Sequence, residues 1–159
     1  MYHKNIQKNF YLKDKNKSFE RLSGEWLWTN TSDTLILQIT PRYKEKYDEK
    51  VSGYRNAYYD TAIIKVKYTK NGITIYDDLE KDIDKICLKP YTFKILTDFF
   101  YLKNLCTKAF SNSYIVFMKG GKSLSLFTNH AKKEKVLLKK EGEYEVVIPN
   151  SIILDKVIE

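Results

Sequence analysis

Apolar and polar side chains alternate along this sequence with a period of two residues, and short turn sequences separate the alternating runs. In Ala62–Thr69, the side chains of Ile64, Val66 and Tyr68 share one face of an extended chain, while lysines occupy the other face. Asn71-Gly72 follows, and this pair suits a type I′ turn because both central residues of that turn need a positive φ. The sequence therefore predicts a β-hairpin centred on this pair.

The same pattern recurs along the chain and predicts about eight to ten strands in total. The other predicted strands are Gly24–Asn30, Asp33–Thr40, Ile73–Tyr76, Thr92–Leu102, Ser113–Met118, Ser123–Thr128, Lys135–Lys139, Tyr144–Ile148 and Ser151–Ile158. The second of these is expected to stop at Pro41, because proline donates no hydrogen bond to a sheet. Serial hairpins form an antiparallel up-and-down meander, and closing it or folding it into two layers protects its edges. We expect an all-β barrel or a barrel-like sandwich.

The chain has 159 residues but only 6 Gly and 3 Pro, so we expect no flexible linker within it. We expect a polar lead-in over residues 1–18 and one β domain over residues 19–159. No apolar run reaches the roughly 20 residues that a transmembrane helix needs. The polar N-terminus shows no signal-peptide pattern, which predicts a cytoplasmic protein. Prior removal of an export signal would instead place it in the cell envelope or periplasm.

The formal net charge of +8 invites a nucleic-acid role, but the kinds of basic residue argue against it. Only Arg21, Arg42 and Arg55 are arginines, and arginine is the residue whose planar fork reads bases and binds phosphate in a bidentate manner. The lysines are interleaved with acidic residues along the whole chain, whereas a nucleic-acid reader gathers its charge on one face. We interpret them as solvated surface lysines and expect no nucleic-acid partner.

Gly24-Glu25-Trp26 opens the first predicted strand of the β domain. It resembles the start of lipocalin and fatty-acid-binding barrels, in which the tryptophan closes one end of the barrel. In lipocalins an arginine near the last barrel strand covers this tryptophan. No arginine follows Arg55 here, so a lysine such as Lys139 or Lys156 would have to take its place. The resemblance implies a lipocalin-like (calycin) architecture by analogy, without membership of the lipocalin family.

A second resemblance rests on five short segments in a fixed order. They are Tyr11-Leu12-Lys13-Asp14, Phe19 through Gly24-Glu25-Trp26, Gly53-Tyr54, Lys70-Asn71-Gly72-Ile73 and Ile148-Pro149-Asn150-Ser151-Ile152-Ile153-Leu154. Together they are similar to an uncharacterised family of small bacterial β proteins that usually carry an export or lipoprotein signal. The resemblance implies a compact β domain in the cell envelope, and it implies no activity and no catalytic residues.

The sequence shows no pattern typical of a catalytic, metal or cofactor site, so we expect neither an enzyme nor a cofactor. His3 and His130 stand far apart in sequence, without the ligand spacing of a zinc site. Cys87 and Cys106 are interpreted as small apolar residues, with one disulfide as the alternative in an oxidising compartment. A Cys–His catalytic pair stays the least favoured alternative.

Carboxylates cluster after the Asn-Gly hairpin, and the cluster lacks the spacing of a calcium-binding loop. Its members are Asp77, Asp78, Glu80, Asp82 and Asp84. We interpret the cluster as a solvated connection, with a weak cation site as the alternative.

Two kinds of binding site are consistent with a non-enzymatic β domain. One is a barrel interior that takes a small hydrophobic molecule, with the candidate residues Trp26, Trp28, Phe93 and Phe117. The other is a tyrosine-rich surface that binds a protein, as an envelope accessory or an inhibitor or immunity-type partner, with the candidate residues Tyr43, Tyr47, Tyr54, Tyr58 and Tyr59. The bulky interior side chains favour a filled core over a cavity, which counts against the first kind.

Overall fold

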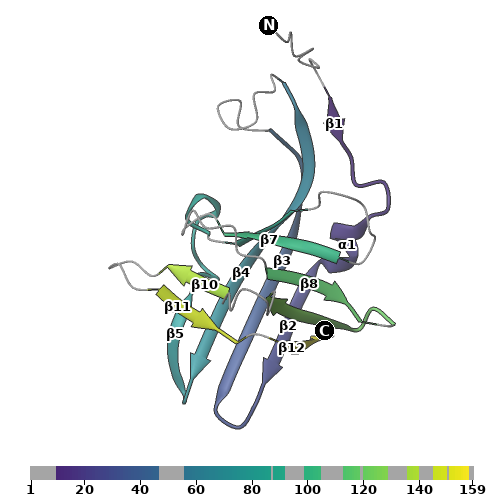
Figure 1. Ribbon diagram of the computed structural model, residues 1–159. Helices are drawn as coiled ribbons and strands as arrows, with labels where there is room; N and C mark the ends of the chain where they lie inside the picture. The colour runs from purple at the N-terminus through teal and green to yellow at the C-terminus, as the bar shows by residue number, and fades with distance from the viewer. Residues whose placement is uncertain are drawn as a thin grey trace, which may run out of the picture.

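The computed structural model (Figure 1) describes residues 10–46, 56–86, 88–91, 99–104, 113–118, 120–128, 136–139, 145–149 and 151–157. Its strands are β1 (Tyr11–Leu12), β2 (Gly24–Thr29), β3 (Asp33–Lys46), β4 (Tyr58–Lys70), β5 (Ile73–Asp77), β6 (Leu88–Tyr91), β7 (Phe99–Asn104), β8 (Ser113–Phe117), β9 (Ser123–Thr128), β10 (Val136–Lys139), β11 (Glu145–Ile148) and β12 (Ile152–Lys156). Its helices are α1 (Ser18–Leu22) and the short 3-10 helix η1 (Ile83–Lys85). The strands curl into a half-barrel, and the predicted all-β class is confirmed.

Many strands that follow one another in sequence also lie side by side in the sheet, and β12 joins the two runs by pairing with both β2 and β9. The ladder runs β4–β3–β2–β12–β9–β8–β7–β6, and each neighbouring pair in it is antiparallel. The last of these strands, β6, meets β4 again through the pair Ile64–Leu88, so the curled sheet returns to its first strand. The main sheet has 10 strands, and β12 lies between β2 and β9, so the strand order is mixed and only parts of the predicted meander are present.

One pair departs from the purely antiparallel prediction. β1 lies parallel to β4, with Tyr11 opposite Tyr58 and Leu12 opposite Tyr59. Parallel neighbours need a long connection, and here α1, β2 and β3 together supply it. The sheet is therefore mixed, and β1 belongs to it although it comes from the segment expected as a polar lead-in.

The Asn-Gly hairpin forms as the sequence predicts. Asn71 has a φ of 50° and Gly72 a φ of 74°, both in the left-handed region that a type I′ turn requires. Lys70 of β4 pairs with Ile73 of β5 across the two turn residues. The hairpin is thus fixed locally by its turn.

The expectation that the strand beginning at Asp33 ends at Pro41 is wrong. Pro41 lies opposite Ala62 of β4, and β3 continues to Lys46. The neighbouring strand β2 begins at Gly24, opposite Ile39, so among the described strands β3 beyond Ile39 has a partner only on the β4 side. Proline is tolerated there because a strand with one open side does not need every N–H in the ladder.

The outer edge of β4, opposite the edge that pairs with β3, is shared by three short strands. β1 pairs at Tyr58–Tyr59, β6 at Ile64, and β5 at Lys67–Lys70. Asp78 fills the interval between β5 and β6. Its N–H donates to the Val66 carbonyl at 3.0 Å, and its carboxylate accepts the Val66 N–H. An aspartate therefore continues the hydrogen bonding of this edge where no strand does.

The core lies on the concave face of the sheet. Trp28, Leu35, Tyr68 and Tyr76 form one cross-strand row on β2, β3, β4 and β5. The next row contains Trp26, Leu37 and Val66, all buried. Such rows bury apolar surface continuously across neighbouring strands. Each Å² of apolar surface removed from water stabilises the fold by about 25 cal/mol.

The short helix α1 packs against β3 and β4 and adds two side chains to the core. The Asp14 carboxylate accepts the Phe19 N–H at 2.8 Å, which satisfies one of the N–H groups that a helix leaves unpaired at its start. Phe19 and Leu22 are buried, and the Trp26 indole N–H donates to the Leu22 carbonyl at 2.9 Å. The Lys156 Nζ lies 5.3 Å from the Trp26 ring centroid, so of the two lysines expected to cover this tryptophan the structure shows Lys156 in that role. The Lys139 side chain lies outside the described residues.

β10 and β11 form a separate two-stranded sheet between β9 and β12 in sequence. Their pairing confirms the hairpin predicted over Lys135–Ile148. Ile148 is buried in the core, whereas Val147 is exposed, as alternation along a half-buried strand requires.

Candidate functional site

The β3–β4 hairpin extends beyond the half-barrel as an arm, which we define as residues 40–46 of β3 and 58–63 of β4. Figure 1 shows the arm rising beside β1, above the rest of the sheet. The register shifts between Arg42 and Glu45, where a bulge interrupts the ladder and Lys44 adopts a φ of 57°. Bulges twist and bend a strand, which turns the arm away from the plane of the sheet.

Pairing on the arm determines which side chains share a face. Tyr58 lies opposite Lys46 on β3 and opposite Tyr11 on β1, so these three share one face. The adjacent residue, Tyr59, points to the other face, together with Leu12.

Tyr43 joins the first of these faces. Its hydroxyl donates to Glu20 Oε1 of α1 at 3.3 Å. It also lies close enough to Tyr11 to contribute to the raised pKa of that residue. We call Tyr11, Tyr43 and Tyr58 the tyrosine face.

Asp60 lies beneath the tyrosine face and accepts three hydrogen bonds. The Tyr11 hydroxyl donates at 2.5 Å, the Asp14 N–H at 2.9 Å and the Lys44 N–H at 3.1 Å. Burial acts to raise the pKa of Asp60, but these donors outweigh it and hold the pKa below its ordinary value of 3.8. The hydrogen bond to Asp60 raises the pKa of Tyr11 to about 12. One buried carboxylate thus joins β1, the following turn and the bulge of β3.

Large hydrophobic side chains are exposed on this part of the molecule. The exposed fraction is 41% for Tyr11, 55% for Leu12 and 52% for Tyr43. Their backbone is fixed by the ladder and by Asp60, so these side chains are presented on a rigid support. Rigid, partly exposed tyrosines are typical of protein-binding surfaces.

The predicted tyrosine set is therefore divided by the structure. Tyr43 and Tyr58 lie together, Tyr59 is on the opposite face, and Tyr47 and Tyr54 lie outside the described residues. Tyr11 was missed by the sequence analysis because its segment was interpreted as a polar lead-in. The adjacent pair Tyr11-Leu12 was the available signal, because two neighbouring large apolar side chains are unusual in a solvated tail and indicate an ordered segment.

The residues predicted to bind a small hydrophobic molecule lie in the core. Trp26 is fully buried and its ring centroid is 6.1 Å from that of Phe117, which in turn lies 6.1 Å from Phe100. The Arg21 guanidinium covers the Phe117 ring at 4.7 Å. Trp28 is partly buried against the same cluster, and Phe93 lies outside the described residues. Their part in ligand binding stays a prediction, whereas their part in packing is visible.

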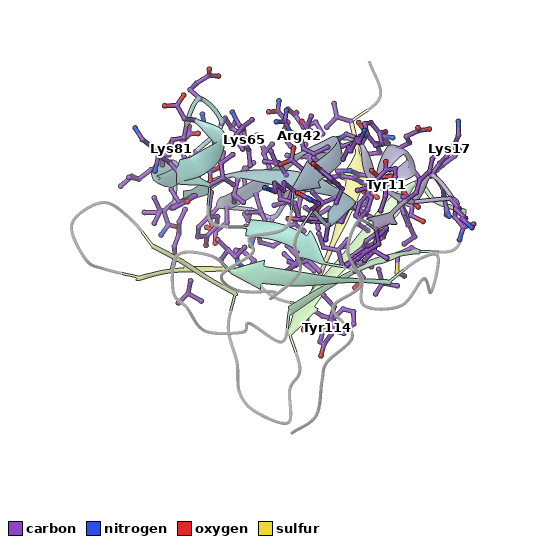
Figure 2. The ribbon with its side chains drawn as sticks, turned by 90° about the horizontal axis from the view of Figure 1, so that it is seen from above. Tyr11, Lys17, Arg42, Lys65, Lys81 and Tyr114 are labelled. Atoms are coloured by element: carbon purple, nitrogen blue, oxygen red, sulfur yellow. The ribbon has the colours of Figure 1, made fainter. Side chains whose placement is uncertain are left out.

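A second buried carboxylate, Asp78, lies further along the β4 edge, between β6 and β5. It is 1% exposed, it accepts the Val66 N–H, and it accepts the Tyr76 hydroxyl at 3.1 Å. Burial raises the pKa of Asp78, and these two donors only partly oppose this effect. The Lys81 ammonium lies 5.3 Å from the Tyr76 ring centroid, and Figure 2 shows Lys81 and Lys65 at the end of the molecule away from Tyr11.

The acidic cluster is thus not uniformly solvated, because Asp78 points into the protein. Asp77 forms a surface ion pair with Lys67 at 3.2 Å, and Asp82 is exposed. Within the described part of the chain, no group of three or more His, Cys, Asp or Glu side chains is placed to hold a metal ion. His3, His130, Cys87 and Cys106 lie outside that part.

No family model, curated protein or solved structure matches this chain. The resemblance to exported bacterial β proteins and the lipocalin analogy therefore stay predictions. Among the described residues, no helix is long and apolar enough to cross a membrane.

Proposed function

We propose that this protein is a non-enzymatic module that binds another protein through the tyrosine face of its β3–β4 arm. The observation that carries the proposal is the exposure of Tyr43 on the β3–β4 arm and of Tyr11 on the adjoining strand β1, both next to a buried carboxylate that accepts hydrogen bonds from β1 and from the arm. A rigid aromatic surface loses little conformational entropy when a partner binds, so its contact area contributes efficiently to affinity.

The division of aromatic side chains between core and surface supports this choice over a carrier of small molecules. Trp26 and Phe117 contact other core rings and are covered by basic side chains, so packing already accounts for both residues. Packing does not account for the ring of Tyr43, about half of which faces solvent.

Site-specific photo-crosslinking tests the proposal. A benzoylphenylalanine residue is placed at position 43, and a matched control carries it at position 153, because Ile153 on β12 has the same exposed fraction of 52%. In an extract of the source cells, we expect position 43 to yield one protein adduct of defined mass that unlabelled wild-type protein suppresses. Position 153 should yield no such adduct.

The competitor variant Tyr43→Ala, Tyr58→Ala provides a second measurement. It should fail to suppress the adduct while keeping the wild-type thermal unfolding midpoint to within a few degrees. Equal crosslinking at positions 43 and 153, or full suppression by this variant, would show that the tyrosine face is not the binding surface.

A further inference from the structure

The strand β1 is held on β4 by polar contacts that a second copy of the same segment can also make. The Tyr58 N–H donates to the Phe10 carbonyl at 2.9 Å. The Tyr11 hydroxyl and the Asp14 N–H both donate to the Asp60 carboxylate, at 2.5 Å and 2.9 Å. These bonds depend on the segment itself and not on the chain that carries it. Residues 10–14 of another copy would therefore form the same bonds.

The side chains of β1 contribute little to the core. The strand has two residues, and Tyr11 and Leu12 keep exposed fractions of 41% and 55%. Neither residue belongs to the buried cluster that joins α1 to the curled sheet. Releasing a side chain costs free energy in proportion to the apolar area that it had buried. Detachment of β1 therefore leaves the core intact.

A short exposed connection joins β1 to α1, as Figure 1 shows. We define Lys15, Asn16 and Lys17, all of them exposed, as the hinge. Lys17 adopts a φ of 54° and a ψ of 34°, and its side chain forms no capping bond to α1. The left-handed region is unfavourable for a residue with a Cβ atom, and short strained hinges favour exchange of the segment that they connect. Straightening the hinge would relieve this strain.

Opening the hinge exchanges contacts between copies and removes few of them. Asp14 moves with β1, so its carboxylate would accept the Phe19 N–H of the second copy in place of the bond of 2.8 Å within one chain. The bond that is lost joins the Lys17 N–H to the Asp14 carbonyl, and it is long at 3.3 Å. Three extended residues span about 10 Å, so two copies can meet at their hinges around a twofold axis. Exchange thus restores nearly every bond that it breaks.

On this basis we infer that two copies of this chain exchange β1, so that residues 10–14 of one copy lie on β4 of the other. Each tyrosine face then combines Tyr43 and Tyr58 of one copy with Tyr11 of the second copy. The dimer presents two complete faces, which would hold a partner with two binding sites by avidity. The inference goes beyond the proposed function, because the exchange needs no other protein.

Sedimentation velocity of the full-length chain over a range of concentrations tests the inference. A salt concentration of about 0.15 M screens the exposed hinge lysines of the two copies from one another. We expect a monomer–dimer equilibrium in the wild type. Lys17→Pro should raise the dimer association constant at least tenfold, because the φ of proline, near −65°, is incompatible with the closed hinge. Lys17→Gly should lower it about tenfold, because glycine adopts a positive φ without this strain.

Two further measurements make the result specific. Lys15→Gly removes the same charge from the same hinge, at a residue outside the left-handed region, and should change the association constant less than about threefold. An NMR sample that mixes ¹³C-labelled and ¹⁵N-labelled copies shows where the dimer forms. The Tyr11 hydroxyl and the Lys44 N–H donate to the same oxygen of Asp60, so a cross-copy NOE should join the Tyr11 ring to the Lys44 amide.

The inference is overturned if the wild type and Lys17→Pro both stay monomeric at every concentration. It is also overturned by a dimer that lacks the cross-copy NOE, or by equal effects of Lys15→Gly and Lys17→Gly. The proposed function is judged separately. A crosslink from position 43 of a monomeric chain would retain the proposed function and reject the exchange, whereas an exchanged dimer without that crosslink would do the reverse.

Discussion

Two regions along the outer edge of β4 each bury an aspartate but stabilise its carboxylate differently, one beside β1 and the other between β6 and β5. Each buries an aspartate against the edge, but Asp60 accepts three hydrogen bonds and Asp78 two. The pKa of Asp60 is lowered and that of Asp78 is raised, although both side chains are nearly inaccessible to solvent. Burial alone therefore does not decide the charge state of a carboxylate, since the number of donors aimed at it decides which effect is larger.

The largest expected effect is that of Asp60→Asn. An amide keeps one acceptor oxygen and places its N–H group against either the Lys44 N–H or the Asp14 N–H, so one backbone donor is left unsatisfied in either orientation. We expect the free energy of unfolding to fall by about 3 kcal/mol, measured by urea denaturation at pH 7. Asp82→Asn, at an exposed carboxylate, is the control and should change it by less than about 0.5 kcal/mol. Equal stability of the two variants would mean that Asp60 does not hold the arm.

Tyr76→Phe is expected to have the next largest effect. It removes the hydroxyl that donates to Asp78 and leaves this carboxylate with the Val66 N–H. A buried hydrogen bond to a charged group contributes roughly 1.5–3 kcal/mol, so a loss of about 2 kcal/mol is expected in the same assay. Tyr68→Phe removes a bond of 3.1 Å to the less buried Asp33 and should lower stability less. The opposite order would contradict the importance of burial at Asp78.

Asp78→Asn should behave unlike Asp60→Asn. The amide oxygen still accepts the Val66 N–H, and the amide N–H faces the Tyr76 hydroxyl, which can rotate to accept it. The charge that burial disfavours is removed. We expect stability at pH 7 to be unchanged or to increase by up to about 1 kcal/mol. A loss as large as that of Asp60→Asn would remove the distinction between the two regions.

The smallest expected effect is a difference between the pH ranges over which Asp60 and Asp78 change the free energy of unfolding. Asp60 has a lowered folded-state pKa, so its stabilisation is complete above 3.8 and is lost as pH falls below that value. Asp78 has a raised folded-state pKa, so its ionisation is unfavourable to folding above that pKa, and this cost vanishes as pH falls towards 3.8.

Unfolding free energies measured from pH 3 to pH 7 check this separation. The wild type and Asp60→Asn should converge below pH 3.8, whereas the wild type and Asp78→Asn should converge above it. Convergence of both pairs in the same range would show that the two carboxylates titrate alike.

The local features of the fold could be predicted from the sequence. Alternation placed Ile64, Val66 and Tyr68 on one buried face, and Asn71-Gly72 fixed a hairpin with positive φ. Both features depend on residues close together in the chain, where a period or a turn preference is sufficient evidence.

The remote contacts could not be predicted in the same way. Tyr11 and Asp60 are 49 residues apart, and no periodicity links them. Both aspartates do follow the two-residue period of a buried face, Asp60 two residues before Ala62 and Asp78 two residues after Tyr76. Asp78 was interpreted as part of a solvated connection and Asp60 received no prediction, because the donors that permit their burial come from other parts of the chain. The candidate site was therefore found only in part, through Tyr43 and Tyr58.

The pairing of β2 with β12 has a consequence for synthesis of the protein. Lys156 lies opposite Trp26, far from it in sequence, so this seam of the sheet cannot form until the segment that contains Lys156 has left the ribosome. Contacts between remote segments slow folding, because the entropy of ordering the intervening chain is lost first. Until then β2 lacks its β12 partner, and an unpaired strand edge of this kind is prone to aggregation.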